Sequence, residues 1–234
     1  MSGAAETRCS KCSLKEICLP MGVDKQDLAR LEKLVKNSKA HHYGDVVLHQ
    51  NDPFHMLYAV KSGMYKSVKV TEQGNERIVG FHLPGELIGL DAIYPQAYPS
   101  SLVALTNSVL CQLDYDQLVG LAASIPPLQR QLMRLSSKEI NITQDRQTTQ
   151  TVEQKLAAFI HNLSVRNEVR GFSATQLRLA MTRQDIASYL GVAAETISRL
   201  LKLFQSRNVL AIKNREMTIL DPATLLILTG CSHA

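Results

Sequence analysis

The sequence predicts an α+β fold in which an N-terminal antiparallel β-roll, a long helix and a C-terminal winged helix-turn-helix follow one another. Short apolar and β-branched runs alternate with turn residues from about residue 41 to 118, which is typical of a small antiparallel barrel or roll. A long helical pattern begins at Pro126-Pro127. Residues 182–206 then show two helical patterns separated by a glycine, which is the spacing of a helix-turn-helix.

The composition is that of an ordinary globular protein. Hydrophobic residues make up 45% of the 234 residues and charged residues 20%. No run approaches the roughly 18 consecutive apolar residues that a membrane span requires. The first residues, MSGAAETRCSKC, lack a basic segment followed by an apolar export signal. We therefore expect a cytoplasmic protein with no membrane partner.

Positive charge is concentrated in the last third of the chain. Residues 155–215 contain ten Lys or Arg and three Asp or Glu, whereas the net charge of the whole chain is +5. A basic segment favours nucleic acid as a partner, because each phosphate that it neutralises releases condensed counterions. Charge alone is about equally consistent with a solvated basic surface.

The N-terminal half is predicted to contain one short helix and several strands. The helix carries Leu28, Leu31 and Leu34 at helical spacing. Turn residues such as Ser62-Gly63 and Pro84-Gly85 separate the strands. The predicted strands are residues 46–48, 56–60, 64–70, 78–81 and 109–113.

The long helix after Pro126-Pro127 carries an apolar seam that requires a partner surface. This partner is either the β-roll of the same chain or a second subunit. Glu139 interrupts the seam, and residues 143–151 contain no apolar side chain. Thr151 and Gln154 then form a capping-box pattern before a new helix, which predicts a domain boundary. The candidate dimerisation residues are Leu128, Leu132, Met133, Leu135, Ile140 and Ile142.

The helix-turn-helix pattern has defined inner and outer faces. Thr182 can cap the first helix, and Gly191 lies where two steeply crossing helices need a residue that tolerates positive φ. Ile197, Leu200 and Leu201 of the second helix are expected to be buried. The alternative is an ordinary helical corner in a core. Two predicted strands, residues 209–213 and 216–220, would add a wing.

A second helix of this kind enters the major groove of DNA with its N-terminal residues against base edges. Arg199 can form bidentate hydrogen bonds with guanine, Glu195 can accept one from a cytosine amino group, and Ser198 can bond to several bases. The alternatives are a helix-dipole interaction for Glu195 and a solvated surface for the others. The candidate DNA contacts are Thr182, Arg183, Glu195, Thr196, Ser198, Arg199, Lys213 and Arg215, the last two as phosphate contacts.

Three of the five cysteines form the pattern C-x2-C-x5-C at Cys9, Cys12 and Cys18. In a cytoplasmic protein this spacing favours a metal site over disulfides, and thiolates suit zinc or an iron–sulfur cluster. The best candidate for a fourth ligand is Cys111, at the end of a predicted strand, whereas Cys231 near the C-terminus is expected to be idle. A four-cysteine cluster with one remote ligand is favoured over zinc, because zinc fingers usually repeat the C-x2-C element. Loop thiols without a metal remain the alternative.

These motifs together resemble one known family. The whole chain is similar to the fumarate–nitrate reduction regulator (FNR) group of the CRP–FNR superfamily. The segments that carry the resemblance are CSKCSLKEIC together with Cys111, TEQGNERIVGFHLPGELIGLDAI, LQRQLMRLSSKEI and MTRQDIASYLGVAAETISRLL.

The resemblance implies an oxygen-labile [4Fe-4S] cluster held by Cys9, Cys12, Cys18 and Cys111, and a homodimer that binds a palindrome similar to TTGAT-N4-ATCAA. Loss of the cluster is implied to weaken the dimer. Ser13 matches a position that influences oxygen attack, with a plain loop hydroxyl as the alternative. The segment Glu72, Gln73, Gly74 and Asn75 matches a surface that contacts RNA polymerase, or it is simply a hairpin turn.

The resemblance also implies four parts of the chain. They are an iron–sulfur loop (1–22), a β-roll sensor domain of the cyclic-nucleotide-binding, jelly-roll type (23–123), a dimerisation helix (124–150) and a winged helix-turn-helix DNA-binding domain (151–234).

The sequence leaves three alternative functions. A cyclic-nucleotide sensor of the CRP branch has an Arg-Ser pair on the cyclic phosphate, whereas this chain has Pro99-Ser100-Ser101 and no arginine between Arg77 and Arg130, so no cyclic nucleotide is expected. A haem sensor would use one of His41, His42, His49, His55 and His82, but would leave the cysteines unexplained. An iron–sulfur electron carrier would leave the helix-turn-helix without a role, and no catalytic constellation indicates an enzyme.

The chain departs from the FNR pattern at the end of the long helix. Residues 143–151, including Thr143 in place of an acidic residue, are more polar than in that family, and this difference affects the expected dimer strength.

Overall fold

The computed structural model describes residues 8–145 and 151–230, of which residues 142–145 are described by backbone alone. The chain separates into two compact units, Met1–Gln147 and Thr148–Ala234. Within the described part of the chain, no helix combines the length and the apolar character that crossing a membrane requires.

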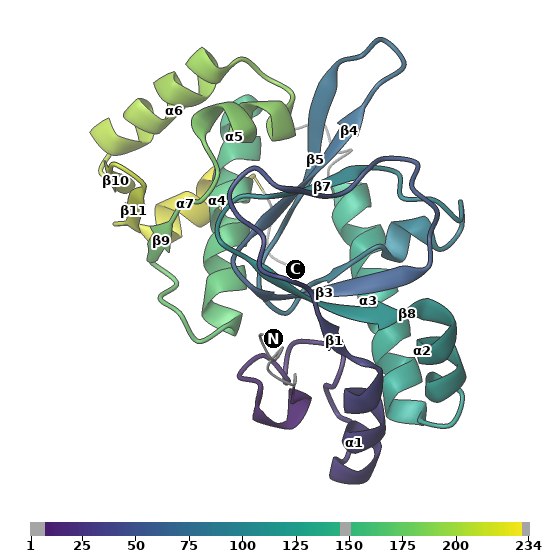
Figure 1. Cartoon of the computed structure of the whole chain (residues 1–234). Coiled ribbons are helices and arrows are strands. Elements are labelled where there is room, and N and C mark those ends of the chain that lie inside the picture. The colour runs from purple at the N-terminus through teal and green to yellow at the C-terminus, as the bar shows by residue number, and fades with distance from the viewer. Residues whose placement is uncertain (1–7, 146–150, 231–234) are drawn as a thin grey trace. The chain divides into compact units, whose positions relative to one another are not determined.

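The first unit contains two four-stranded antiparallel sheets (Figure 1). Their strands are β1 (Lys36–Asn37), β2 (Val46–Leu48), β3 (Met56–Ser62), β4 (Tyr65–Val70), β5 (Glu76–His82), β6 (Leu87–Ile88), β7 (Ser101–Ala104) and β8 (Val109–Asp114). The first sheet has the order β1-β8-β3-β6 and the second the order β2-β7-β4-β5. The five predicted strands are confirmed, with ends that shift by at most two residues. The short strands β1, β6 and β7 were not predicted.

The interior of this β-roll is filled from both sheets and from two flanking helices. Leu57 of β3 pairs with Leu113 of β8, and both are buried. The helices α1 (Lys25–Leu34) and α2 (Tyr115–Ala122) add Leu31 and Leu118 to the same core. Burial of such side chains supplies most of the folding free energy, at roughly 25 cal/mol per Å² of apolar surface.

The long helix α3 (Pro126–Asp145) packs against its own β-roll through part of the predicted seam. Leu128 is fully buried in the core of the unit, with 0% of its surface exposed. Leu132 and Leu135 are half-buried against that core. Leu128 is therefore a core residue of its own chain, and its prediction as a dimer contact is corrected, because a second copy cannot reach it. The side chain of Ile142 lies outside the described residues.

Two other predicted dimerisation residues have large exposed surfaces on α3. Met133 is 70% exposed and Ile140 is 58% exposed. The helix thus has an inner face that is anchored on the β-roll and an outer face that presents apolar side chains to solvent.

The second unit is a winged helix-turn-helix. Its elements are α4 (Val152–Val169), β9 (Gln176–Arg178), α5 (Arg183–Leu190), α6 (Ala194–Ser206), β10 (Leu210–Lys213), β11 (Glu216–Ile219) and α7 (Pro222–Leu228). The strands form one antiparallel sheet in the order β10-β11-β9, so the two predicted wing strands are confirmed and β9 is a third that was not predicted. The predicted capping box at the start of α4 is also confirmed, because Thr151 and Gln154 each bond to the other's backbone N–H.

Replacing Gly63 with alanine is expected to destabilise the β-roll strongly. Gly63 has φ +78°, and an added Cβ would lie 2.0 Å from Ser108 Oγ and 2.6 Å from the carbonyl oxygen of Asn107. Gly44 is a matched control, because its φ is +87° and nothing lies within 4 Å of its Cβ position. Urea unfolding followed by circular dichroism should show a loss of roughly 1 kcal/mol for Gly44→Ala from backbone strain alone, and a clearly larger loss for Gly63→Ala. Equal losses in the two variants would contradict the packing described for Gly63.

Candidate metal centre and nucleic-acid interface

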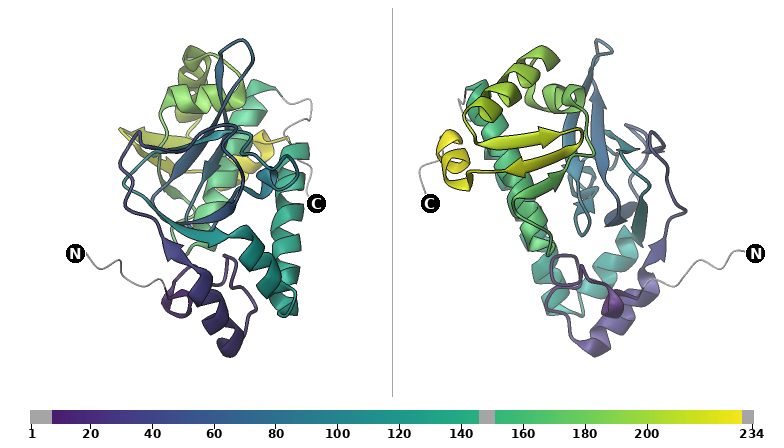
Figure 2. Two further views of the ribbon diagram at one scale, coloured as in Figure 1. Left: turned by 45° about the vertical axis from the view of Figure 1, so that its right-hand side comes forward. Right: turned by 90° about the vertical axis from the view of Figure 1, so that its left-hand side faces the viewer.

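The four cysteines of the predicted metal site line one cavity. Cys9 begins a single 3-10 turn (Cys9–Lys11), Cys12 and Cys18 follow in the same N-terminal loop, and Cys111 lies on β8. The loop lies beside α1 (Figure 2). The remaining lining is apolar apart from two lysines and consists of Leu14, Lys15, Leu19, Pro20, Leu31, Val35, Ala59, Val60, Lys61 and Leu113.

Hydrogen bonds fold the first part of the loop and attach it to α1. The backbone N–H of Cys12 donates to the carbonyl oxygen of Cys9 over 3.1 Å, which closes the 3-10 turn. The N–H of Ser10 donates to Glu32 Oε1 on α1 over 2.7 Å. A loop tied to a helix in this way holds its first two thiols close to the sheet that carries Cys111.

Packing against the Pro84-Gly85 turn holds the second part of the loop. Gly85 has φ +87°, and a Cβ at this position would lie 3.0 Å from two side-chain carbons of Ile17. The N–H of Cys18 donates to the carbonyl oxygen of Leu14 over 3.0 Å. The glycine therefore serves two purposes, since it permits the turn and leaves room for the loop.

Burial controls the charge state of the thiols. It raises the pKa of Cys9 and of Cys18 to about 12 each, and the pKa of Cys111 to about 11. The neighbouring thiols and the Glu32 carboxylate also raise the pKa of Cys9, whereas the Lys61 ammonium partly offsets the effect of burial on the pKa of Cys111. Without a positive centre these three thiols are protonated at neutral pH. Metal binding must therefore displace protons, so the affinity of the thiols for a metal falls as the pH falls.

The donor set is consistent with an iron–sulfur cluster. Among the described residues, no three His, Cys, Asp or Glu side chains converge closely enough to hold one metal ion. A single zinc ion needs every sulfur at about 2.3 Å. In a four-iron cluster each thiolate binds a different iron, so the four sulfurs surround a cavity and need not converge on one point. Four thiols around a largely apolar cavity meet that requirement.

The helix-turn-helix is built by side-chain caps and a left-handed glycine. Thr182 caps α5, because the N–H of Asp185 donates to Thr182 Oγ1 over 3.0 Å and the N–H of Thr182 donates to the Asp185 carboxylate over 2.8 Å. The hydroxyl of Thr182 is used in this cap, so a DNA contact by that hydroxyl would have to compete with it. Gly191 has φ +71°, and the N–H of Val192 then donates to the carbonyl oxygen of Ala187 over 3.0 Å, which ends α5 before the turn.

The helix α6 has one buried face and one polar face. Ile197, Leu201 and Phe204 are buried, whereas Leu200 is only half-buried. The candidate base contacts are on the other face, where Glu195 and Arg199 are exposed and Thr196 and Ser198 are half-buried. The residue before the helix, Ala193, provides no side-chain cap, so the first N–H groups of α6 have no cap from that side chain. Helix N-termini of this kind favour phosphate groups.

The remaining candidate phosphate contacts are exposed basic side chains. Lys213 ends β10, and Arg215 lies in the two-residue turn before β11, in which Asn214 has φ +57°. Arg183 is exposed at the start of α5. Arg178 on the unpredicted strand β9 is a further exposed basic side chain, and its Nε lies 3.6 Å from Glu216 Oε1.

Comparison with known proteins identifies the family. The chain matches the family models for the cyclic nucleotide-binding domain, over residues 39–124, and for the Crp-like helix-turn-helix domain, over residues 154–227. It is 41% identical over 234 residues to the fumarate and nitrate reduction regulatory protein of Vibrio cholerae. The alignment covers 99% of this chain and 94% of the relative. The chain belongs to the fumarate and nitrate reduction regulator (FNR) family.

Other relatives agree with this FNR assignment. The chain is 40% identical over 228 residues to the transcriptional activator protein Anr of Pseudomonas aeruginosa, which covers 96% of this chain and 93% of the relative. The structure of FixK2 from Bradyrhizobium japonicum superimposes on this chain with a TM-score of 0.76 at 22% sequence identity. The superposition covers 85% of this chain and 99% of FixK2, and this similarity supports the fold. FNR-family proteins are transcription regulators with a DNA-binding helix-turn-helix, and they are not enzymes.

The hairpin that the FNR resemblance associates with RNA polymerase joins β4 to β5. Figure 1 shows this hairpin beside the labels β4 and β5. Glu72, Gln73, Gly74 and Asn75 lie between the two strands and are all exposed. Gly74 has φ +80°, and its N–H donates to the carbonyl oxygen of Thr71 over 2.8 Å. The four residues therefore form a well-defined turn that a partner can reach.

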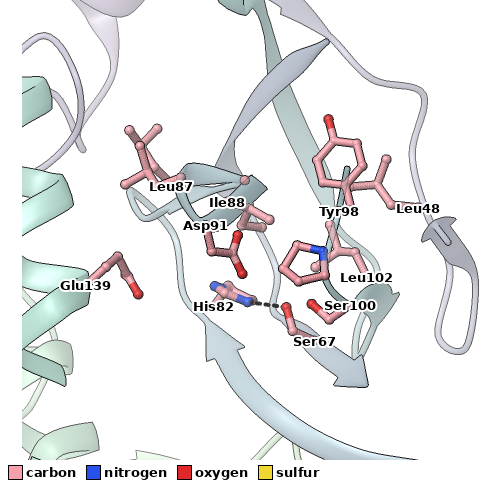
Figure 3. A pocket seen from close by; sticks show the side chains of 13 residues that line it. Leu48, Ser67, His82, Leu87, Ile88, Asp91, Tyr98, Ser100, Leu102 and Glu139 are labelled. Atoms are coloured by element: carbon pink, nitrogen blue, oxygen red, sulfur yellow. Dashed lines mark hydrogen bonds between the residues drawn. The ribbon is translucent and has the colours of Figure 1, made fainter. Parts of the chain in front are cut away.

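A second cavity in this FNR-type β-roll tests the cyclic-nucleotide alternative. Its polar lining includes the carboxylates of Asp91 and Glu139, and His82 Nε2 lies 2.7 Å from Ser67 Oγ (Figure 3). The predicted Pro99-Ser100 segment also lines it, and none of the described residues around it is a lysine or arginine. An anionic phosphate would meet carboxylates there without the bidentate arginine partner that the cyclic-nucleotide alternative requires.

Two of the five histidines of the haem alternative have structural contacts. His41 is buried, and its Nδ1 lies 2.9 Å from the hydroxyl of Tyr65. His82 is half-buried, and its Nε2 lies 2.7 Å from Ser67 Oγ. A buried histidine that is satisfied by a hydrogen bond, as His41 is, is typical of a core.

Proposed function

We propose that this protein is an oxygen-responsive transcription regulator in which Cys9, Cys12, Cys18 and Cys111 hold a [4Fe-4S] cluster. The single observation that carries the proposal is that all four thiols line one largely apolar cavity, although one of them is about 100 residues away in the sequence. The cluster, when bound, supplies a cationic centre that oxygen can attack. The names of the relatives, which include anaerobic regulatory proteins, are consistent with this role.

The end of the cysteine loop contacts α3, the proposed dimerisation helix. Arg134 Nη1 of α3 lies 3.0 Å from the sulfur of Met21, which follows the last loop cysteine. When the thiols lose their metal, the loop loses its central attachment, and the inner-face contacts of α3 change. The exposed Met133 and Ile140 would then be less well placed to pair with a second copy. This is a population shift between monomer and dimer.

The dimer brings two α6 helices to a palindromic DNA site. A pair of recognition helices must be about 34 Å apart, one turn of DNA, to read both half-sites. Arg199 and Glu195 are the exposed candidates for base contacts, and the palindrome TTGAT-N4-ATCAA contains the guanine and cytosine that they would recognise. Lys213, Arg215 and Arg183 would bind phosphates, which fixes the register of the protein on the duplex.

The bound dimer would act on transcription in the cytoplasm, activating or repressing genes of anaerobic metabolism. The hairpin tip at residues 72–75 is the proposed contact with RNA polymerase, because its polar residues are exposed. Neither a membrane nor a cyclic nucleotide is part of this proposal.

Replacing Cys111 with alanine is expected to abolish the cluster. Protein purified without oxygen should lose most of its iron, its acid-labile sulfide and the broad charge-transfer absorption, because three loop thiols alone leave one iron without a protein ligand. The control is Cys231→Ala, which removes a cysteine that has no proposed role. Retention of a full cluster that still bleaches in air in Cys111→Ala would contradict the ligand assignment.

Replacing Arg199 with alanine is expected to reduce sequence discrimination rather than general DNA affinity. Loss of a bidentate guanine contact costs about 1–3 kcal/mol of discrimination. Anaerobic fluorescence anisotropy with the palindrome, and with a duplex whose guanines are exchanged, measures this difference. Arg183→Ala is the control and should weaken binding to both duplexes alike, with a shallower salt dependence. Unchanged discrimination in Arg199→Ala would contradict the base-reading role.

A further inference from the structure

One buried polar side chain joins the proposed dimerisation helix to a proposed cluster ligand. Gln131 on α3 is only 6% exposed, and its Nε2 donates to the carbonyl oxygen of Cys18 over 3.1 Å. A glutamine is seldom fully buried unless its amide is hydrogen-bonded, because an unsatisfied amide in a core costs about 1–3 kcal/mol. The contact therefore fixes Gln131 and the end of the cysteine loop relative to each other.

The carbonyl that accepts this hydrogen bond belongs to the same residue as the proposed ligand sulfur. It is bonded directly to the Cα atom that carries the Cys18 thiol. A contact that fixes this carbonyl therefore also fixes the position from which the Cys18 sulfur reaches the cavity. The N–H of Met21 also donates to this carbonyl, over 3.2 Å, but it belongs to the loop itself.

We propose that Gln131 is a positioning residue that couples α3 to the cluster through the Cys18–Leu19 peptide. The surroundings and solvent exposure of the ligating sulfurs tune the potential of an iron–sulfur cluster. A shift of α3 on dimer formation or DNA binding changes the Gln131 contact, and the change reaches the Cys18 sulfur. Because coupling between two sites is reciprocal, the state of the cluster biases α3 through the same contact. The inference rests on the proposed function and adds a direct chemical route between its two parts.

The test uses Gln131→Met, which keeps the length of the side chain and removes the donor. The matched control is Gln129→Met, the same change at an exposed position of the same helix. Both proteins are purified without oxygen and assayed for iron and sulfide. Resonance Raman spectra of the iron–sulfur stretches, and the half-life of the cluster in air with and without saturating palindromic DNA, are then compared with those of the unmodified chain.

Gln131→Met is expected to hold a full cluster with shifted terminal iron–sulfur stretches, and to lose on the order of twofold in the protection that DNA gives the cluster. Gln129→Met should behave as the unmodified chain does. Identical spectra and identical DNA protection in all three proteins would overturn the inference.

A second measurement applies if Gln131→Met does not assemble a cluster. The unmodified chain is compared with itself, free and bound to DNA. A change in the terminal iron–sulfur stretches on DNA binding supports the coupling, and unchanged stretches overturn it. If the unmodified chain purified without oxygen contains no cluster at all, the proposed function itself fails, and this result is distinguishable from both of the others.

Discussion

The burial of thiol sulfurs between the N-terminal loop and β8 is the constraint on which the other features depend. Burial raises the pKa of Cys9 and Cys18 to about 12, so the thiolate forms are unfavourable unless a cationic centre compensates them. The loop has one short 3-10 turn and packs Leu19 into the core of the β-roll, so it has no core of its own. A metal centre held by the loop cysteines and Cys111 would supply the charge compensation and a further attachment of the loop to the sheet.

The helix α3 can be affected by the attachment of the loop because its inner face contacts the loop and the β-roll, whereas its outer face is exposed. Leu128 is buried in the β-roll, which anchors the start of the helix. Gln131 and Arg134 contact the end of the cysteine loop. On the outer face, Met133 lies between these two residues in the sequence and Ile140 lies further along the helix, and both are exposed. A change at the loop can thus alter how the outer face is presented while Leu128 holds the start of α3 on the β-roll.

The parts of the fold that sequence predicted are those with a strong local signal. Turn residues separated the longer strands, and Thr151, Thr182 and Gly191 marked helix ends by their capping chemistry. The strands β1, β6 and β9 have two or three residues each, which is too short to show a periodic pattern. A heptad seam indicates that a helix has a partner but not which partner. The assignment of Leu128 to the dimer was wrong for that reason.

The sequence predicted which cysteines belong to the candidate site, but not the hydrogen bond between the cysteine loop and α3. The spacing of Cys9, Cys12 and Cys18 indicates a metal site, and Cys111 was the best remaining candidate. Gln131 gave no signal, because a glutamine on an amphipathic helix is typical of a solvated face. Only the docking of the loop, 113 residues away in the chain, buries it.

The most direct test of the central claim is the molar mass of the full chain by light scattering, on one sample purified without oxygen and then exposed to air. Iron and sulfide are assayed at each time point. The account predicts that the dimer fraction falls in step with the loss of iron and sulfide. A dimer fraction that stays constant while iron and sulfide are lost would contradict it.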